Sequence, residues 1–100
     1  MLEYMGQIVQ ALAGRDRGGI FCVVGVDREQ ERLLLADGKR RKASHPKAKK
    51  PAHVRLLTEP QRGGFHHPAI QALQRGETVY DRELRRAIAA FKEEMSLGKG

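Results

Sequence analysis

The chain has 100 residues, 40% of them hydrophobic, and a formal net charge of +7, which predicts about one domain with a modest core. It contains no run of about eighteen apolar residues, and its first residues do not resemble a secretion signal, so we expect neither a membrane span nor export. A single cysteine, Cys22, excludes an internal disulfide. Together these features predict a cytoplasmic protein.

The positive charge is concentrated in one short part of the chain. Residues 37–55 hold eight Lys and Arg against one acid, Asp37, whereas the other residues hold eleven basic and eleven acidic groups. A local block of this kind predicts a surface that binds a polyanion, and nucleic acid is the favoured polyanion. A membrane surface is a weaker candidate because no apolar helical stripe accompanies the block. The alternative is a solvated loop that binds nothing.

The first half of the chain has the pattern of short strands separated by turns. We expect strands over residues 6–12, 20–26, 33–36, 40–43 and 53–57, with residues 44–52 as a loop. Three glycines within residues 14–19 predict a turn, and Asp37-Gly38 predicts a hairpin. Five short strands with tight turns predict a mainly β fold, a small barrel, over residues 1–60.

We expect residues 61–100 to form a linker and a helical extension, with the linker over residues 60–64. Pro68 and Gly76 are placed to begin and end a first helix. Asp81 is placed to cap a second helix. The apolar side chains of the second helix recur on one face: Leu84, Ile88, Phe91 and Met95. Packing against the barrel or the neighbouring helix is the favoured interpretation of this face, and a docking surface for a protein is the alternative.

The turn between the first two expected strands combines glycines with arginines. Glycines without a Cβ allow a tight turn and let backbone N–H groups approach a phosphate. Arg15 and Arg17 offer forked donors to phosphate oxygens or flat surfaces for base stacking. Asp16 is placed to orient either arginine through an ion pair. The alternative is a simple hairpin whose arginines are solvated.

Residues 4–58 resemble a KOW module, in which a strand, a basic loop with glycines and a second hydrophobic strand follow one another. The resemblance is carried by residues 6–24 and by two further stretches, Ala36-Asp37-Gly38-Lys39-Arg40-Arg41-Lys42 and Lys49-Lys50-Pro51-Ala52-His53-Val54. These stretches are similar to bacterial KOW-domain RNA-binding proteins related to archaeal and eukaryotic large-subunit ribosomal proteins. The resemblance implies a five-stranded SH3-like barrel, here followed by one or two helices, and binding to ribosomal RNA or the large ribosomal subunit without catalysis.

We therefore expect a non-enzymatic RNA-binding protein that needs no cofactor, metal or small-molecule substrate, with ribosomal proteins as further candidate partners. The residues expected at RNA lie in the glycine-arginine turn and the basic block: Arg15, Arg17, Gly18, Lys39, Arg40, Arg41, Lys42, Lys47, Lys49 and Lys50. If the consecutive residues 39–42 form a strand, Lys39 and Arg41 share one face, and Arg40 and Lys42 share the other. The alternative function is a protein-interaction adaptor in translation or transcription.

Three further residue types were candidates for chemistry. The histidines lack the Cys or carboxylate spacing that completes a zinc site. Cys22 lies in a hydrophobic run, which predicts a small buried side chain and not a catalytic thiol. Phe65 is placed either to stack on a base or to fix the extension to the barrel.

Overall fold

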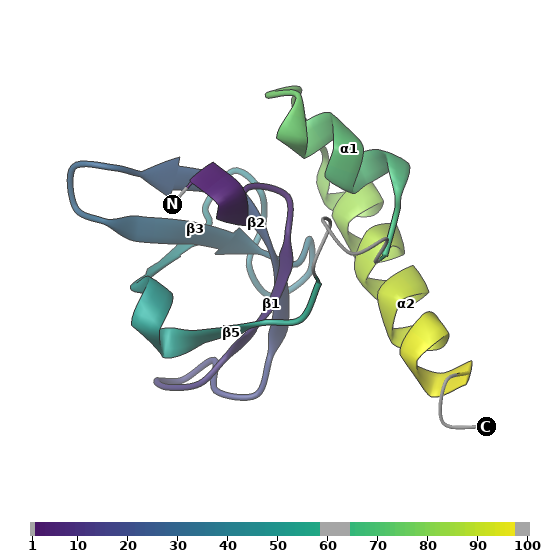
Figure 1. Ribbon diagram of the computed structural model, residues 1–100, viewed down its shortest axis with the longest axis horizontal. Coiled ribbons are helices and arrows are strands. Elements are labelled where there is room, and N and C mark those ends of the chain that lie inside the picture. Colours follow the sequence, from purple (N-terminus) through teal and green to yellow (C-terminus); the bar gives the residue numbers. More distant parts are fainter. Residues whose placement is uncertain (1, 59–64, 98–100) are drawn as a thin grey trace.

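The computed structural model of the protein describes residues 2–58 and 65–97, with side chains through Met95. Five strands and two α-helices make up most of it, together with two 3-10 helices (Figure 1). In chain order the elements are η1 (Leu2–Tyr4), β1 (Ile8–Ala11), β2 (Ile20–Asp27), β3 (Arg32–Ala36), β4 (Lys47–Lys49), η2 (Pro51–His53), β5 (Val54–Leu56), α1 (Pro68–Gln74) and α2 (Asp81–Leu97). The expected linker over residues 60–64 lies outside the described residues.

The strands form one sheet in the order β4-β3-β2-β1-β5, and every neighbouring pair is antiparallel. The register between β2 and β3 shifts between Val23 and Gly25, an irregularity that bends and twists a strand. Figure 1 shows the strands curling, with both helices on one side of them. The expected mainly β fold is confirmed, although the described strands do not close into a barrel because β4 and β5 remain the two edges.

The expected strand over residues 40–43 is wrong, and so is the expected loop over residues 44–52, because the fourth strand is Lys47–Lys49. This strand pairs with β3, with Lys47 opposite Leu35 and Lys49 opposite Leu33. Residues 37–41 instead form a turn, in which Asp37 Oδ1 accepts hydrogen bonds from the backbone N–H groups of Lys39 and Arg41, each at 2.9 Å. The side chain thus takes backbone donors that a strand would give to its neighbour. The expected split of Lys39 to Lys42 between two strand faces is therefore wrong as well.

Alternate side chains of the strands enter two hydrophobic clusters on the two faces of the sheet. Val9, Phe21 and Leu35 belong to a cluster enclosed by the curled strands. The neighbouring positions Ile8, Cys22 and Ala36 face the helices instead, in a second cluster that also contains Ala69, Ile70, Leu73, Val79, Leu84, Ala87, Ile88 and Phe91. The helical extension therefore shares a core with the sheet.

The apolar face of α2 confirms the packing interpretation over most of its length. Leu84, Ile88 and Phe91 are buried, whereas Met95 is 49% exposed. Phe65 packs edge-on against Phe91, with ring centroids 5.5 Å apart, and borders the hydrophobic cluster that the helices share with the sheet. Cys22 is fully buried, as expected. Within the described residues, neither helix is long and apolar enough to cross a membrane.

Candidate nucleic-acid interface

The glycine-arginine loop, residues 12–19, joins β1 to β2 and is closed by its own backbone. Gly14 and Gly18 have positive φ angles of 78° and 87°, as expected for turn glycines. The N–H of Gly18 donates to Ala11 O at 2.8 Å and that of Gly19 to Asp16 O at 2.8 Å, while Arg17 N–H donates to Gly14 O at 3.2 Å. These three amides are therefore used within the loop. These three N–H groups therefore cannot donate to a phosphate as expected, and the arginine side chains of the loop remain as donors.

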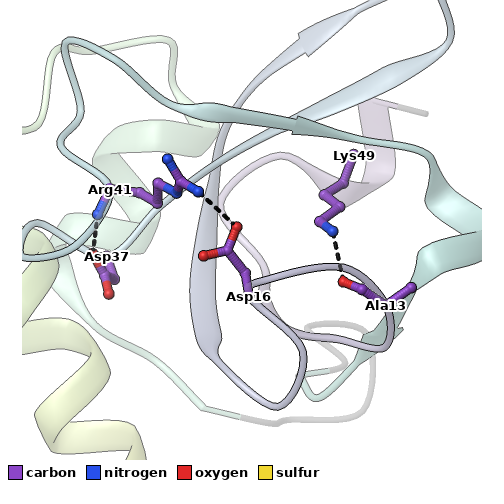
Figure 2. A network of polar contacts seen from close by, with 5 residues as sticks. All are labelled: Ala13, Asp16, Asp37, Arg41 and Lys49. Carbon is purple, nitrogen blue, oxygen red and sulfur yellow. Dashed lines mark hydrogen bonds and ion pairs between the residues drawn. The ribbon is translucent and has the colours of Figure 1, made fainter.

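Asp16 points into the molecule, and its partner is neither of the neighbouring arginines that we expected. Its Oδ2 accepts a hydrogen bond from Arg41 NH2 at 3.0 Å (Figure 2). Asp16 is 3% exposed, so the ion pair satisfies a carboxylate that is almost fully withdrawn from water. The backbone N–H of Arg41 is held in turn by Asp37. The loop and the basic turn are thus joined across 25 residues of sequence.

Lys49 makes a second connection to the loop. Although it belongs to the basic block, it is 9% exposed, and its Nζ donates to Ala13 O at 2.7 Å (Figure 2). A Cβ added to Gly14 would lie 2.7 Å from this Nζ, so the glycine makes room for the ammonium group. The structure gives Lys49 the role of holding the loop against β4, and its charge is directed inward.

The remaining candidate cations lie on the surface. Seven of the ten candidate residues are exposed Lys or Arg side chains: Arg15, Arg17, Lys39, Arg40, Lys42, Lys47 and Lys50. Gly18 is also exposed, and Arg41 is half-buried. Because the contacts of Arg41 and Lys49 join the loop, the turn and β4, the exposed cations stand on segments that the fold brings together.

The basic turn is also docked on the first turn of α2, which the sequence did not reveal. Arg85 NH1 donates to Gly38 O at 2.7 Å, and Ala43 N donates to Asp81 Oδ1 at 2.7 Å. A Cβ on Gly38, whose φ is 77°, would collide with the Asp81 carbonyl group. Asp81 was expected to cap the helix, and its carboxylate instead fixes the end of the basic turn. An Asp-Gly turn is expected to hold its glycine at a positive φ angle. That expectation was the one signal in the sequence of the close contact between Gly38 and Asp81.

One other surface feature adjoins the end of the basic turn. A largely apolar groove of about 450 Å³ separates the sheet from the connection between α1 and α2, and its walls include Val24, Leu34, Pro46 and the exposed Tyr80. His67 caps α1 by accepting a hydrogen bond from Ala69 N at 3.1 Å. Among the described residues, no group of three or more His, Cys, Asp and Glu side chains is placed to hold a metal ion.

No family model matches the chain, and no curated protein matches its sequence. A function is therefore inferred from the residues and geometry of this chain.

Proposed function

We propose that the protein is a cytoplasmic, non-enzymatic RNA-binding protein that attaches to ribosomal RNA or the large ribosomal subunit. The observation that carries the proposal is the location of the excess charge. Residues 37–55 hold the whole net excess of +7, and most of their cations are exposed. Lys and Arg that neutralise phosphates release condensed counterions, and this supplies much of the affinity for nucleic acid.

Two internal contacts support the proposal by showing that the basic segment is held in place. Arg41 and Lys49 direct their charges inward, to Asp16 and to Ala13 O. Their neighbours Arg40, Lys42 and Lys50 direct theirs to solvent. A flexible charged loop would lose conformational entropy on binding, whereas a segment fixed in advance loses less.

The fold is compatible with the family resemblance. Five antiparallel strands in the order β4-β3-β2-β1-β5 can form an SH3-like barrel, the architecture that a KOW module implies. The glycine-arginine loop lies between β1 and β2, where the resemblance places the basic loop of the module. KOW identity and ribosomal RNA as the target are both parts of the proposal.

The test is an RNA titration at several salt concentrations. For several phosphate contacts, the logarithm of affinity should fall linearly with the logarithm of salt concentration, with a slope of roughly −3 to −5 on single strands. Replacing Arg15 and Arg17 together by Ala should weaken binding and make the slope shallower by about 1.4, while the melting curve stays unchanged because both side chains are exposed. A flat salt response would overturn the proposal.

The alternative is a protein-interaction adaptor in translation or transcription. Ribosome co-sedimentation before and after nuclease digestion separates the two functions. Loss of association only after digestion supports RNA as the partner. Association that persists on a protein component after digestion supports the adaptor, and RNA binding would then be incidental.

A further inference from the structure

A small cleft lies where the basic turn meets the long helix. Its volume is about 210 Å³, and it separates residues 37–39 from one face of α2. Its lining comes from β2, from the turn and from the helix: Ile20, Asp37, Lys39, Arg85, Ile88, Ala89 and Lys92. Arg85 and Lys92 belong to the helical extension, outside the segment that resembles a KOW module.

The charged groups of the cleft are strongly unbalanced. Lys39, Arg85 and Lys92 contribute three cations, against the one carboxylate of Asp37. Asp37 Oδ1 already accepts two backbone hydrogen bonds from the turn. Within residues 2–58 and 65–97, neither Lys39 nor Lys92 has a carboxylate within ion-pair distance.

Arg85 is held at the edge of this cleft by the fold. Its NH1 donates to Gly38 O at 2.7 Å, and the described residues offer no partner to its other N–H groups. A guanidinium that is fixed through one nitrogen can present the others to an anion, and Arg suits phosphate because its donors form a planar fork. The apolar side chains of Ile20 and Ile88 line the same cleft.

We propose that this cleft binds a phosphate group of the RNA backbone, so that α2 forms a second wall of the RNA interface. The inference rests on the proposed function, and it extends that function to the helical extension. Lys39 connects the two surfaces, because it stands in the cleft and also belongs to the basic turn. An anion in the cleft would be attracted by three cations, which is the physical reason for the site.

The test compares two substitutions that remove one charge each from exposed positions of α2. Lys92→Gln removes a cleft cation, and Arg86→Gln removes a cation that does not line the cleft. Glutamine is a good helix former, so both full-length variants should melt as the wild type does. Lys92→Gln should weaken RNA binding about three- to tenfold and make the salt slope shallower by about 0.7 to 0.9, whereas Arg86→Gln should change both far less.

A third variant, Ala89→Glu, introduces an acid into the cleft and should weaken RNA binding more than Lys92→Gln. If wild-type protein binds no RNA, the proposed function fails and this inference fails with it. If the wild type binds RNA, but Lys92→Gln and Ala89→Glu match Arg86→Gln, the cleft is not an RNA contact and the proposed function stands.

A titration with inorganic phosphate, followed by the amide NMR signals of Lys39 and Lys92, distinguishes the source of the phosphate. We expect weak binding that RNA displaces. Binding of phosphate in this cleft that RNA does not displace would identify a site for a free phosphate and overturn the assignment to RNA.

Discussion

The guanidinium of Arg41 donates to the buried carboxylate of Asp16 at 3.0 Å, so a cation of the basic block holds the glycine-arginine loop in place. Asp37 fixes the backbone of the same arginine through a hydrogen bond of 2.9 Å. The two carboxylates thus determine where the turn stands relative to the loop. Because the loop and the turn carry most of the exposed candidate cations, this pair positions the surface that we propose binds RNA.

Replacing Asp16 by Asn separates positioning from simple attraction. The substitution raises the net charge by one, so long-range electrostatics alone predicts tighter RNA binding. We expect weaker binding and a loss of about 1–3 kcal/mol in the free energy of unfolding, because the charge-assisted hydrogen bond to Arg41 is lost. Chemical denaturation and an RNA titration measure the two effects. Tighter binding with unchanged stability would show that Asp16 does not position the interface.

Lys47 and Lys49 provide a matched pair in one strand, since Met at either position removes one positive charge. Lys49→Met should lower the free energy of unfolding by about 1–2 kcal/mol, because the part-buried hydrogen bond from Lys49 Nζ to Ala13 O is lost. Lys47→Met should leave stability unchanged and weaken RNA binding, because Lys47 is exposed. Equal losses of RNA affinity with unchanged melting curves would instead mean that Lys49 contacts RNA directly.

The sequence predicted four of the five strands because their side chains carry the pattern that strands require. β-branched and apolar residues over Ile20–Asp27 and Arg32–Ala36 mark the centre of the sheet. Lys47–Lys49 has no such pattern, and it becomes a strand because β3 offers it a free edge. Residues 40–43 were wrongly predicted to form a strand. The hydrogen bond that the Asp37 carboxylate accepts from the backbone of this turn cannot be recognised from the alternation of polar and apolar side chains.

The candidate site was predictable in composition but not in arrangement. A count of charges located the basic block, and most of its side chains are exposed as expected. The partners Asp16 and Arg41 stand 25 residues apart, and the burial of Lys49 depends on packing against the loop. The cleft cations Arg85 and Lys92 were missed because only the docking of α2 brings them to the turn.

Leu84 and Met95 test whether the helices and the sheet fold as one unit. Leu84 is fully buried in the cluster that contains Ile8 and Cys22, so Leu84→Ala should lower the free energy of unfolding by about 2–5 kcal/mol. Met95→Ala, on the same helical face but half exposed, should have little effect. In each variant, spectroscopic signals from the strands and from the helices should show the same unfolding transition. Deleting residues 61–100 should prevent folding, since it uncovers this cluster. A separate transition for the helices would contradict the shared core.

Cys22 makes stability depend on pH in the alkaline range. Burial, with a smaller contribution from Asp37, raises the pKa of its thiol from the ordinary 9.0 to about 12. Between these values the unfolded chain releases a proton that the folded chain keeps, so the contribution to stability is complete below pH 9.0 and is lost as pH rises to about 12. The free energy of unfolding of Cys22→Ala should therefore fall less steeply over this window. If the free energy of unfolding of the two proteins depended on pH in the same way, the pKa of the Cys22 thiol would not be raised in the folded protein.

Gly18 isolates the backbone requirement of the glycine-arginine loop. Its φ is 87°, and a Cβ added there would meet no heavy atom within 4 Å, so any cost of substitution comes from the backbone and not from a collision. Gly18→Val should lower the free energy of unfolding by about 1–3 kcal/mol, because a β-branched residue is strained at positive φ. Gly18→Asn should cost less, since Asn tolerates the left-handed region. Thermal melting ranks the variants, and an RNA titration below both melting temperatures should give near wild-type affinity for Asn. If Val and Asn melt at the same temperature, the loop relaxes to negative φ, and the glycine is not required for its shape.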